Sequence, residues 1–301
     1  MATMTHIVKR SFRYNTSGFW YKGNVHTHSK ESDGGKSFAE LAEMYANAGY
    51  NFLFRTDHWV CSNALQEKDI YPVLWLDGVE IDGTNSTGGW YHVVCLGVLK
   101  GLSREEGFDA CLQTARQQGA LLILAHPHWS ENSLEDALRW AFDGVEIYNH
   151  TCHWLNGKGD GLVHWGAMLK KNPMTLAFSV DDVHLRLENI GWNGGWIMVN
   201  AARCSRKEIL HAIRCGNYYS TCGPDFHAIE FDGQDLHIKT SPIRFARLVG
   251  PGCLGRRVGT FNGPELTQFS ISVPKDWVYT YVEIEDTVGK RAWTNGLFLI
   301  G

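Results

Sequence analysis

Short apolar segments alternate with amphipathic ones between about residue 21 and residue 216 of this 301-residue chain. The run ALLILAHP at 120–127 is almost entirely apolar, which is typical of a strand buried on both faces of a parallel sheet. The segment at 37–50 is typical of a helix, because Ser37 and Glu40 can form a capping box and Gly49 can end it. The alternation predicts an α/β fold with a mostly parallel sheet, open or closed into a barrel.

The remaining elements follow from the same patterns. Strands are expected at 21–29, 51–58, 71–81, 90–98, 120–127, 144–149, 174–182 and 194–201, and helices at 37–49, 104–119, 132–141, 161–171 and 205–216. After residue 220 no helical pattern is present, and segments such as FHAIEFDG and FSISVP alternate apolar and polar residues between turns. We therefore expect two domains, residues 1–216 and residues 217–301, of which the second is a small antiparallel β-sandwich.

Composition and charge exclude several classes of protein. Hydrophobic residues make up 44% of the chain, enough for a full core, and the net charge of 28 − 32 = −4 disfavours a nucleic-acid partner. The eight cysteines include no Cys-x-x-Cys pair, which indicates reduced thiols rather than a disulfide framework or a thiolate zinc site. The sequence contains no apolar leader pattern and no segment of membrane-spanning length, so we expect a cytoplasmic protein; its oligomeric state stays open.

Histidines and carboxylates fall repeatedly where the predicted strands end. These residues are His26, His28, Asp33, His58, Glu80, His126, Asp182 and His184, and His92 lies within the strand expected at 90–98. Because the carboxyl ends of parallel strands meet at one face, the side chains should converge there. In an extended segment, residues two apart project the same way, so Asp182 rather than Asp181 should share a face with His184. Imidazoles and carboxylates without thiolates suit zinc, manganese or iron.

The motifs resemble those of the PHP (polymerase and histidinol phosphatase) superfamily over about residues 20 to 216. The matching motifs are His26-x-His28 with Ser32-Asp33-Gly34, Thr56-Asp57-His58, Glu80, His92, Ala125-His126-Pro127 and Asp182-x-His184. The resemblance implies a distorted seven-stranded (β/α) barrel with a trinuclear metal site. The tail beyond residue 217 looks like the C-terminal β domain of the branch that includes carbaryl-type hydrolases, which cleave a carbamate ester.

Carried over by motif, the resemblance implies three sets of metal ligands. The first is His26, His28, Glu80 and Asp182; the second is Glu80, as a bridge, with His92 and His126; the third is Asp33, His58 and His184. Two or three divalent ions of zinc, manganese or iron are thus the expected cofactors.

The expected chemistry is hydrolysis of a small-molecule ester. Metals that share a carboxylate can acidify a bridging water to a hydroxide nucleophile, and a third metal can draw off the negative charge of a phosphate. A phosphoesterase is therefore favoured, and a hydrolase of carboxylic or carbamate esters is the alternative. A non-catalytic, metal-stabilised binding module is disfavoured, because a structural metal site is closed by four ligands.

Two further residues are candidates for roles in catalysis and substrate binding. His128 lies two positions after His126, so it could face the pocket as a general acid, or it could be a loop histidine that covers the site. Arg55 could clamp an anion or pair with a surface carboxylate, and its neighbour Asp57 could orient a metal ligand.

The pocket walls are also suggested by the sequence. Tyr148 and Asn149, at the end of the segment GVEIYN, could line the pocket. Tryptophans in loop-like stretches either pack at the bases of loops or form an aromatic rim around the pocket. These tryptophans are Trp129, Trp154, Trp192 and Trp196.

Overall fold

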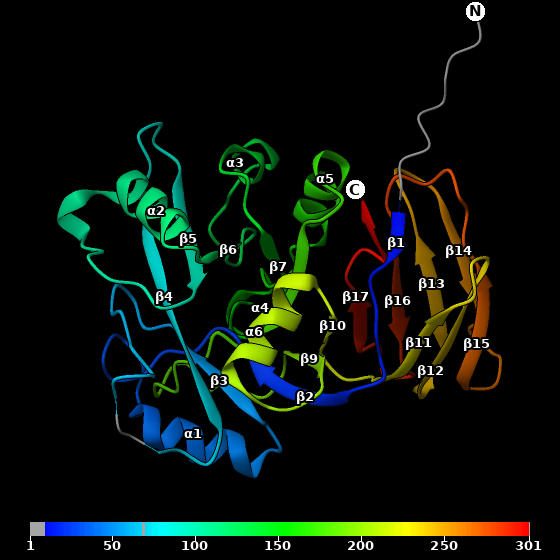
Figure 1. The fold of residues 1–301 in the computed structure, drawn as a ribbon, viewed down its shortest axis with the longest axis horizontal. Helices are drawn as coiled ribbons and strands as arrows, with labels where there is room; N and C mark the ends of the chain where they lie inside the picture. Colours follow the sequence, from blue (N-terminus) through cyan, green and yellow to red (C-terminus); the bar gives the residue numbers. More distant parts are fainter. Residues whose placement is uncertain (1–9, 68–69, 301) are drawn as a thin grey trace, which may run out of the picture.

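Strands and helices are mixed along the chain up to residue 216 in the computed structural model, which describes residues 10–67 and 70–300 (Figure 1). The strands are β1 (Arg10–Phe12), β2 (Phe19–Asn24), β3 (Phe52–Arg55), β4 (Leu74–Thr84), β5 (Trp90–Leu96), β6 (Leu121–Leu124), β7 (Gly144–Asn149), β8 (Leu176–Val180), β9 (Trp196–Ala201), β10 (Tyr218–Thr221), β11 (Phe226–Phe231), β12 (Asp235–Ile243), β13 (Phe245–Val249), β14 (Gly255–Val258), β15 (Leu266–Ser272), β16 (Tyr281–Glu285), β17 (Arg291–Thr294) and β18 (Phe298–Ile300). The helices are α1 (Phe38–Asn47), the 3-10 helix η1 (Arg104–Glu106), α2 (Phe108–Gln117), α3 (Leu134–Arg139), α4 (His150–Asn156), α5 (Leu162–Lys171) and α6 (Arg206–Cys215).

Local signals in the sequence explain where several helices begin and end. Ser37 caps α1, and its side chain and that of Glu40 form the predicted capping box. Gly216, with a φ of 71°, ends α6 as predicted. The helix expected at 104–119 is divided in two, because Gly107 takes a φ of 83° between η1 and α2. Helix α4 was not predicted.

The large sheet is mixed rather than mostly parallel. Its strand order is β14-β13-β16-β17-β10-β9-β2-β3-β4-β5-β6-β7-β8. The pairs β2–β3, β3–β4, β6–β7 and β7–β8 are parallel, whereas β5 is antiparallel to both neighbours and β9 is antiparallel to β2. The expectation of a mostly parallel sheet fails at β5, because residues 85–89 form a turn that is too short for a parallel crossover.

The sheet curves until its edge strand β8 comes beside β10. Ser179 on β8 donates from its backbone N to Ser220 Oγ at 3.0 Å, and Tyr218 Oη donates to the carbonyl of Ala177 at 2.9 Å. Side-chain hydrogen bonds of this kind join the two strands. The predicted number of seven barrel strands stays a prediction.

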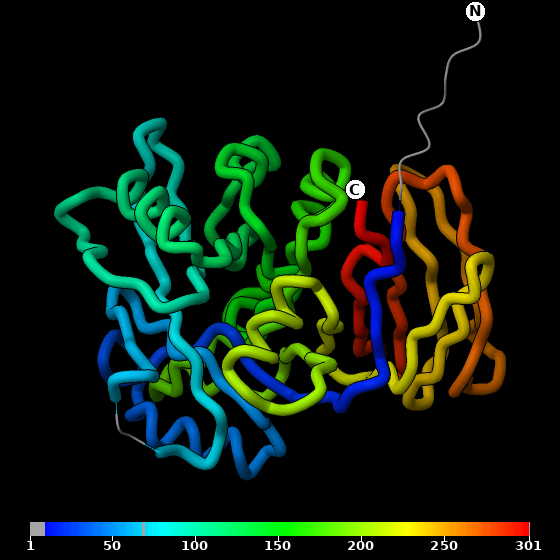
Figure 2. Tube along the Cα trace, viewed as in Figure 1, coloured from blue at the N-terminus to red at the C-terminus, as the bar shows by residue number. Residues whose placement is uncertain are grey.

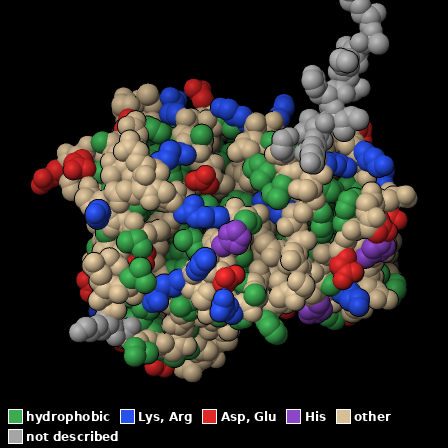
Figure 3. Space-filling view, in the orientation of Figure 1, with side chains coloured by type: hydrophobic (Ala, Val, Ile, Leu, Met, Phe, Trp, Pro, Cys, Tyr) green, Lys and Arg blue, Asp and Glu red, His purple; other side chains and the backbone are tan. Residues whose placement is uncertain are grey.

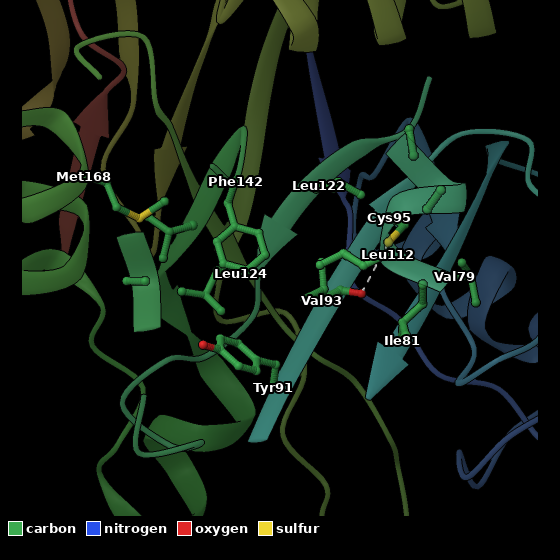
Figure 4. Packing of buried hydrophobic residues seen from close by; sticks show 14 of the residues in the cluster. Val79, Ile81, Tyr91, Val93, Cys95, Leu112, Leu122, Leu124, Phe142 and Met168 are labelled. Atoms are coloured by element: carbon green, nitrogen blue, oxygen red, sulfur yellow. Dashed lines mark hydrogen bonds between the residues drawn. The ribbon is translucent and has the colours of Figure 1, made fainter. Parts of the chain in front are cut away.

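The main hydrophobic core lies between the curved sheet and helices α2, α3 and α5 (Figure 4). Val79, Tyr91, Leu122 and Leu124 from the strands pack there with Leu112 from α2, and all are 1% exposed or less. Strands that are covered by helices on one face must place polar residues elsewhere. The metal-ligand candidates therefore lie after the strands or, as Glu80 and His92 do, within β4 and β5 at positions that alternate with residues of this core.

An antiparallel β region follows α6, as predicted. The large sheet continues through β10 into β17, β16, β13 and β14, and a second sheet of β11, β12 and β15 packs over it around a separate apolar cluster. The beginning of the described chain also belongs here, because β1 pairs antiparallel with β18 (Figure 2). The proposed boundary at residue 216 therefore divides a continuous sheet, and Arg10–Phe12 lie with the second region rather than the first.

The surface carries both signs of charge. Lys and Arg side chains alternate with Asp and Glu across the face shown in Figure 3, with hydrophobic side chains between them. Among the described residues, no helix is long and apolar enough to cross a membrane.

Candidate metal centre

The predicted ligands come together from six strands. His26 and His28 follow β2, His58 follows β3, His126 follows β6, and Asp182 and His184 follow β8. Glu80 and His92 lie inside the neighbouring strands β4 and β5, and Asp33 lies in the loop before α1. A parallel bridge between Thr27 and Val183 holds the two loops that carry the His-x-His and Asp-x-His motifs side by side.

Four ligand atoms form a tight group at the centre. His26 Nε2, His28 Nε2 and Glu80 Oε2 lie 3.0 Å from one another, and Asp182 Oδ1 lies 3.3 Å and 3.2 Å from the two ring nitrogens. Tetrahedral ligands at about 2.0–2.1 Å from a zinc ion would be about 3.3–3.4 Å apart. These spacings are those of a group arranged around one ion, with little adjustment.

The second oxygen of Glu80 faces other histidines. Glu80 Oε1 lies 2.7 Å from His92 Nδ1 and 3.5 Å from His126 Nε2, and His126 Nε2 lies 3.8 Å from Asp182 Oδ2. His58 Nε2 also approaches Glu80, at 3.4 Å from Oε2, so that His58, Glu80 and His92 form a group able to hold a metal. The carboxylate of Glu80 thus lies between ligand groups on two sides.

A further group surrounds Asp33 near the surface. Asp33 Oδ2 lies 3.3 Å from His184 Nε2, and Asp33 Oδ1 lies 3.6 Å from His28 Nδ1 and 4.0 Å from His58 Nε2. These side chains are the third implied set with His28 added. All nine predicted ligands therefore lie in one continuous cluster.

Partners behind the histidines fix which ring nitrogen faces the centre. Glu146 Oε1 lies 2.6 Å from His26 Nδ1, Asp82 Oδ1 lies 2.9 Å from His58 Nδ1, and the carbonyl of Asp182 lies 2.9 Å from His184 Nδ1. Glu146 and the carbonyl of Asp182 can accept a proton from Nδ1 of His26 and His184, which leaves the Nε2 lone pair directed at the cluster, whereas Asp82 and His58 are close without hydrogen-bond geometry. Orientation of this kind is typical of histidines that bind metals.

The buried charges shift one another's pKa values. Burial alone would raise the pKa of Glu80, but the surrounding imidazoles, led by His58, outweigh it and hold this pKa well below its usual value. Burial likewise opposes protonation of His26, yet the surrounding carboxylates, led by Asp182, raise the pKa of His26 well above its usual value. The cluster therefore contains ionised carboxylates that attract cations, and a bound metal ion would replace protons on the imidazoles.

The residues present fit divalent metal ions. Oxygen and imidazole donors without thiolates suit zinc, manganese or iron. His92 Nε2 and Asp182 Oδ1 are buried without a hydrogen-bond partner in the described chain, although buried polar atoms are normally paired. Metal coordination would satisfy such atoms.

Asp182 enters the cluster and Asp181 does not, but strand alternation is not the reason. Strand β8 ends at Val180, and Asp182 takes a φ of 55°, which turns its side chain toward His26. Asp181 instead accepts hydrogen bonds from Tyr45 Oη at 2.7 Å and from backbone nitrogens of residues 193–195. Positive φ is costly for a residue with a Cβ, so this conformation must be held by the surrounding contacts.

A cavity of about 280 Å³ adjoins the cluster. Its walls come from the cluster itself, from the turn after β6, from helix α4 and from the hairpin after His184. The lining residues outside the predicted ligands are Trp129, Thr151, Cys152, Leu155, Arg186, Glu188 and Asn189. The ligand cluster is thus accessible to a small molecule from one side.

Comparison with solved structures supports the fold. A two-domain protein from Bacteroides vulgatus ATCC 8482, described as containing a predicted PHP-like metal-dependent phosphoesterase, matches over 100% of this chain and 99% of its own, with a TM-score of 0.53 and 14% identity. An amidohydrolase from Chromobacterium violaceum matches 56% of this chain and 90% of its own, with a TM-score of 0.41 and 14% identity. No family model and no curated protein matches the chain.

The chain has a PHP-like fold. The resemblance seen in the motifs is thereby confirmed at the level of the fold. The assignment to the carbaryl-type branch stays a prediction.

His128 does not face the cavity of this PHP-like fold. Its side chain is exposed, and it is not among the lining residues. The expectation assumed an extended segment, but His126 takes a φ of 26° and residues 126–131 form a turn, in which Ser130 N donates to the carbonyl of His126. Trp129, which lies between the two, lines the cavity instead.

Arg55 supports the ligand loop rather than binding an anion in the cavity. Its guanidinium pairs with Asp57 at 3.2 Å and with Glu67 at 3.4 Å, and it does not line the cavity. Asp57 is fully buried and accepts hydrogen bonds from Ser29 N at 2.6 Å and from Ser32 Oγ at 2.8 Å. Asp57 therefore fixes the loop between His28 and Asp33, in keeping with the orienting role suggested for it.

Tyr148 and Asn149 do not line the cavity either, and Asn149 acts behind the ligands. Tyr148 Oη lies 3.1 Å from His150 Nδ1. Asn149 Nδ2 donates to Asp182 Oδ2 at 3.1 Å and to Glu146 Oε2 at 2.9 Å, while its Oδ1 caps α4 by accepting from Cys152 N at 2.9 Å. Asn149 is thus a positioning residue between α4 and the cluster.

The tryptophans divide between the two roles considered. The ring of Trp129 lines the cavity and lies edge-on to His126, with the centroids 5.1 Å apart, and Trp90, which does not line the cavity, packs against Trp129 with the centroids 5.9 Å apart. Trp192 packs against Tyr45, and Trp196 packs under Lys22. The sequence indicated no role for Glu146 or Asp82, although a carboxylate in an otherwise apolar strand such as GVEIYN is the signal that could have identified Glu146.

Proposed function

We propose that this protein is a metal-dependent hydrolase of ester bonds, with phosphoric esters as the favoured substrates. The observation that carries the proposal is the group formed by His26, His28, Glu80 and Asp182, whose facing atoms are separated by distances typical of ligands around one ion. A cavity open to a small molecule adjoins this group, which a purely structural metal site does not need.

The cluster would hold two or three ions of zinc, manganese or iron. His26, His28, Glu80 and Asp182 would bind the first ion, Glu80 with His92 and His126 the second, and Asp33, His58 and His184 the third. Bound ions of this kind supply an acidified water as the nucleophile and stabilise negative charge that develops on the substrate. His58 lies near both Asp33 and Glu80, so its ring would bind the ion beside one of these carboxylates or the ion beside the other.

The protein itself supplies position and exclusion of water. Glu146, Asp82 and Asn149 hold ligand side chains from behind, so little reorganisation is needed when ions bind. Trp129 and helix α4 cover one side of the cavity. Arg186, whose guanidinium lies 3.2 Å from Asp33 Oδ2, is placed to meet an anionic substrate at the mouth.

A hydrolase of carboxylic or carbamate esters is the second candidate, and the charge of the cavity favours it. Among the described residues that line the cavity, Arg186 is the single Lys or Arg, and it already pairs with Asp33. A bound phosphate would therefore depend on the metal ions to neutralise most of its negative charge, whereas a carbamate needs less charge neutralisation.

A substrate screen separates these candidates. The purified protein is stripped of metal and reloaded with Zn²⁺, Mn²⁺ or Fe²⁺, and hydrolysis of para-nitrophenyl phosphate, bis-para-nitrophenyl phosphate and para-nitrophenyl acetate is measured. Metal-dependent cleavage of either phosphate supports a phosphoesterase, and cleavage of the acetate alone supports the second candidate. No metal binding and no hydrolysis in any combination would contradict the proposal.

A further inference from the structure

Two polar atoms in the wall of the cavity lack partners. Thr151 Oγ1 and Asn189 Oδ1 are buried without a hydrogen bond in the described chain, and their residues are 2% and 7% exposed. Both residues line the cavity, Thr151 from α4 and Asn189 from the hairpin after His184. Neither belongs to the predicted ligand set. Because a buried oxygen without a partner costs free energy, these two atoms indicate a binding surface for another polar group.

The two oxygens border one small space beside Gly191. A Cβ built on Gly191 would lie 3.6 Å from Thr151 Oγ1 and 3.8 Å from Asn189 Oδ1. Because residue 191 has no side chain, a methyl-sized space remains there, with His150 Cδ2 as its third neighbour at 3.7 Å from the same position, and we call it the Thr151–Asn189 notch. A hydroxyl or N–H group that entered it could donate to either oxygen, and Thr151 could also donate in return.

Apart from Arg186 and Glu188, the residues of this wall are neutral. Trp129 and Leu155 provide aromatic and aliphatic surface, and burial raises the pKa of the Cys152 thiol, which keeps it uncharged. Arg186, already paired with Asp33, is the single Lys or Arg among the described lining residues, so the cavity offers no second site for a phosphate. A group that fits this wall is uncharged.

We propose that the alcohol part of the substrate is a neutral, ring-sized apolar group with one hydrogen-bonding substituent that enters the Thr151–Asn189 notch. This inference rests on the proposed function, because it takes the cavity to be the place where an ester meets the metals. It names a class of substrate: esters of hydroxylated or amide-bearing aromatic or alicyclic alcohols, rather than nucleotides or sugar bisphosphates.

The inference is tested by binding, without turnover. The metal-loaded protein is titrated with benzyl alcohol and with its ortho, meta and para hydroxylated forms, and each dissociation constant is measured by ligand-observed NMR. At least one hydroxylated form should bind about 2- to 12-fold more tightly than benzyl alcohol, the gain expected from one net hydrogen bond. Trp129→Ala should weaken the binding of all four alcohols, because it removes the aromatic wall.

Two variants test whether the preference for a hydroxylated alcohol arises at the Thr151–Asn189 notch. Thr151→Val removes Oγ1 at nearly constant volume, and Gly191→Ala places a methyl group in the notch at ordinary contact distances. Each should abolish the preference for the hydroxylated form while leaving the affinity for benzyl alcohol within about twofold. Gly166→Ala is the matched control, because a Cβ there meets nothing within 4 Å and lies in α5. Circular dichroism confirms that each variant is folded.

The results distinguish this inference from the proposed function. No binding of any alcohol, equal affinity for all four, or a preference that survives both Thr151→Val and Gly191→Ala would overturn the inference. None of these results would affect metal-dependent ester hydrolysis, which the substrate screen measures separately. Conversely, the ratios of the dissociation constants of benzyl alcohol and its hydroxylated forms can be measured whether the protein cleaves phosphate, carboxylate or carbamate esters.

Discussion

Glu80 is the residue on which the candidate metal centre depends most, because its two oxygens face different groups of ligands. Oε2 lies 3.0 Å from both His26 Nε2 and His28 Nε2, and Oε1 lies 2.7 Å from His92 Nδ1. Glu80→Gln keeps the shape but replaces one oxygen with an NH₂ group that cannot bind a metal. We expect at least two fewer metal ions per chain by elemental analysis and a loss of activity greater than that of His92→Ala.

The matched control is Glu188→Gln, which changes a carboxylate that lines the same cavity outside the ligand groups. It should keep the full metal content. A Glu80→Gln protein with full metal content and full activity would show that Glu80 is no ligand.

The adjacent acids Asp181 and Asp182 should respond differently to the same substitution. Asp182→Asn should lower metal content, because Asp182 Oδ1 belongs to the central group. Asp181→Asn should keep the metals but lower the thermal midpoint, since Asp181 accepts four hydrogen bonds from Tyr45 and the loop at 193–195, and weakening them costs about 1–3 kcal/mol. If both Asp181→Asn and Asp182→Asn are folded and lose the same amount of metal, Asp181 is a metal ligand as well, and the roles given to the two residues are wrong.

Residue patterns predicted the cluster better than its surroundings. Ligands such as His58 and His126 were found because strand ends converge in any fold of this kind, whatever the details of the loops. His128 was misplaced because the chain turns at His126, where a φ of 26° breaks the extended geometry assumed. Glu146 was missed because its role depends on a contact with His26, 120 positions away, that no local pattern records.

At the level of elements, helix existence was easier to predict than strand direction. Helices with clear caps, such as α1, begin and end where expected. Helix α4 was missed because its seven residues, HTCHWLN, have little helical propensity and depend on the cap at Asn149 and on packing. The direction of β5 could not be inferred from an apolar pattern, because parallel and antiparallel strands share the same alternation.

Asn149 links helix α4 to the metal ligands, and its two functions can be separated. Asn149→Ser retains an oxygen able to cap α4 but loses the Nδ2 group that donates to Asp182 and Glu146. The helix should therefore stay formed while metal affinity falls about 10- to 100-fold, the usual effect of removing a group that orients a ligand. Asn149→Ala removes both and should also lose about 1 kcal/mol of stability.

Metal affinity is measured by competition with a chromogenic chelator, and stability by chemical unfolding. If Asn149→Ser and Asn149→Ala bind metal as tightly as the wild-type protein, Asn149 acts only as a helix cap. The same pair of measurements thus distinguishes support of the helix from support of the ligands.

The two regions of the whole molecule are joined more closely than the sequence indicated. Strand β10 pairs with β9 on one side and with β17 on the other, and β1 pairs with β18 at the opposite end of the described chain, with Arg10 facing Ile300. Tyr14 Oη also donates to the carbonyl of Tyr218 at 2.8 Å. Local periodicity predicts that such strands exist but carries no information about which distant strand each one meets. The boundary at residue 216 follows the change of pattern, and it falls between β9 and β10, which pair in one sheet.

This continuity determines what truncation should do. All nine proposed ligands lie at or before His184, so residues after β10 are not needed for metal binding. A chain that ends at Gly216 loses β10, including Tyr218, which is fully buried and bonded to Ala177 on β8. Loss of one such aromatic side chain costs about 3–5 kcal/mol, a large part of a typical total stability of about 5–15 kcal/mol.

We expect the chain that ends at Gly216 to aggregate. A chain that ends at Cys222 keeps β10 and should stay folded, at lower stability, with its full metal content by elemental analysis. The full-length protein prepared in the same way is the control. A soluble, folded chain ending at Cys222 without metal would mean that the second region supplies a ligand, and His227 on β11 would be the first residue to substitute.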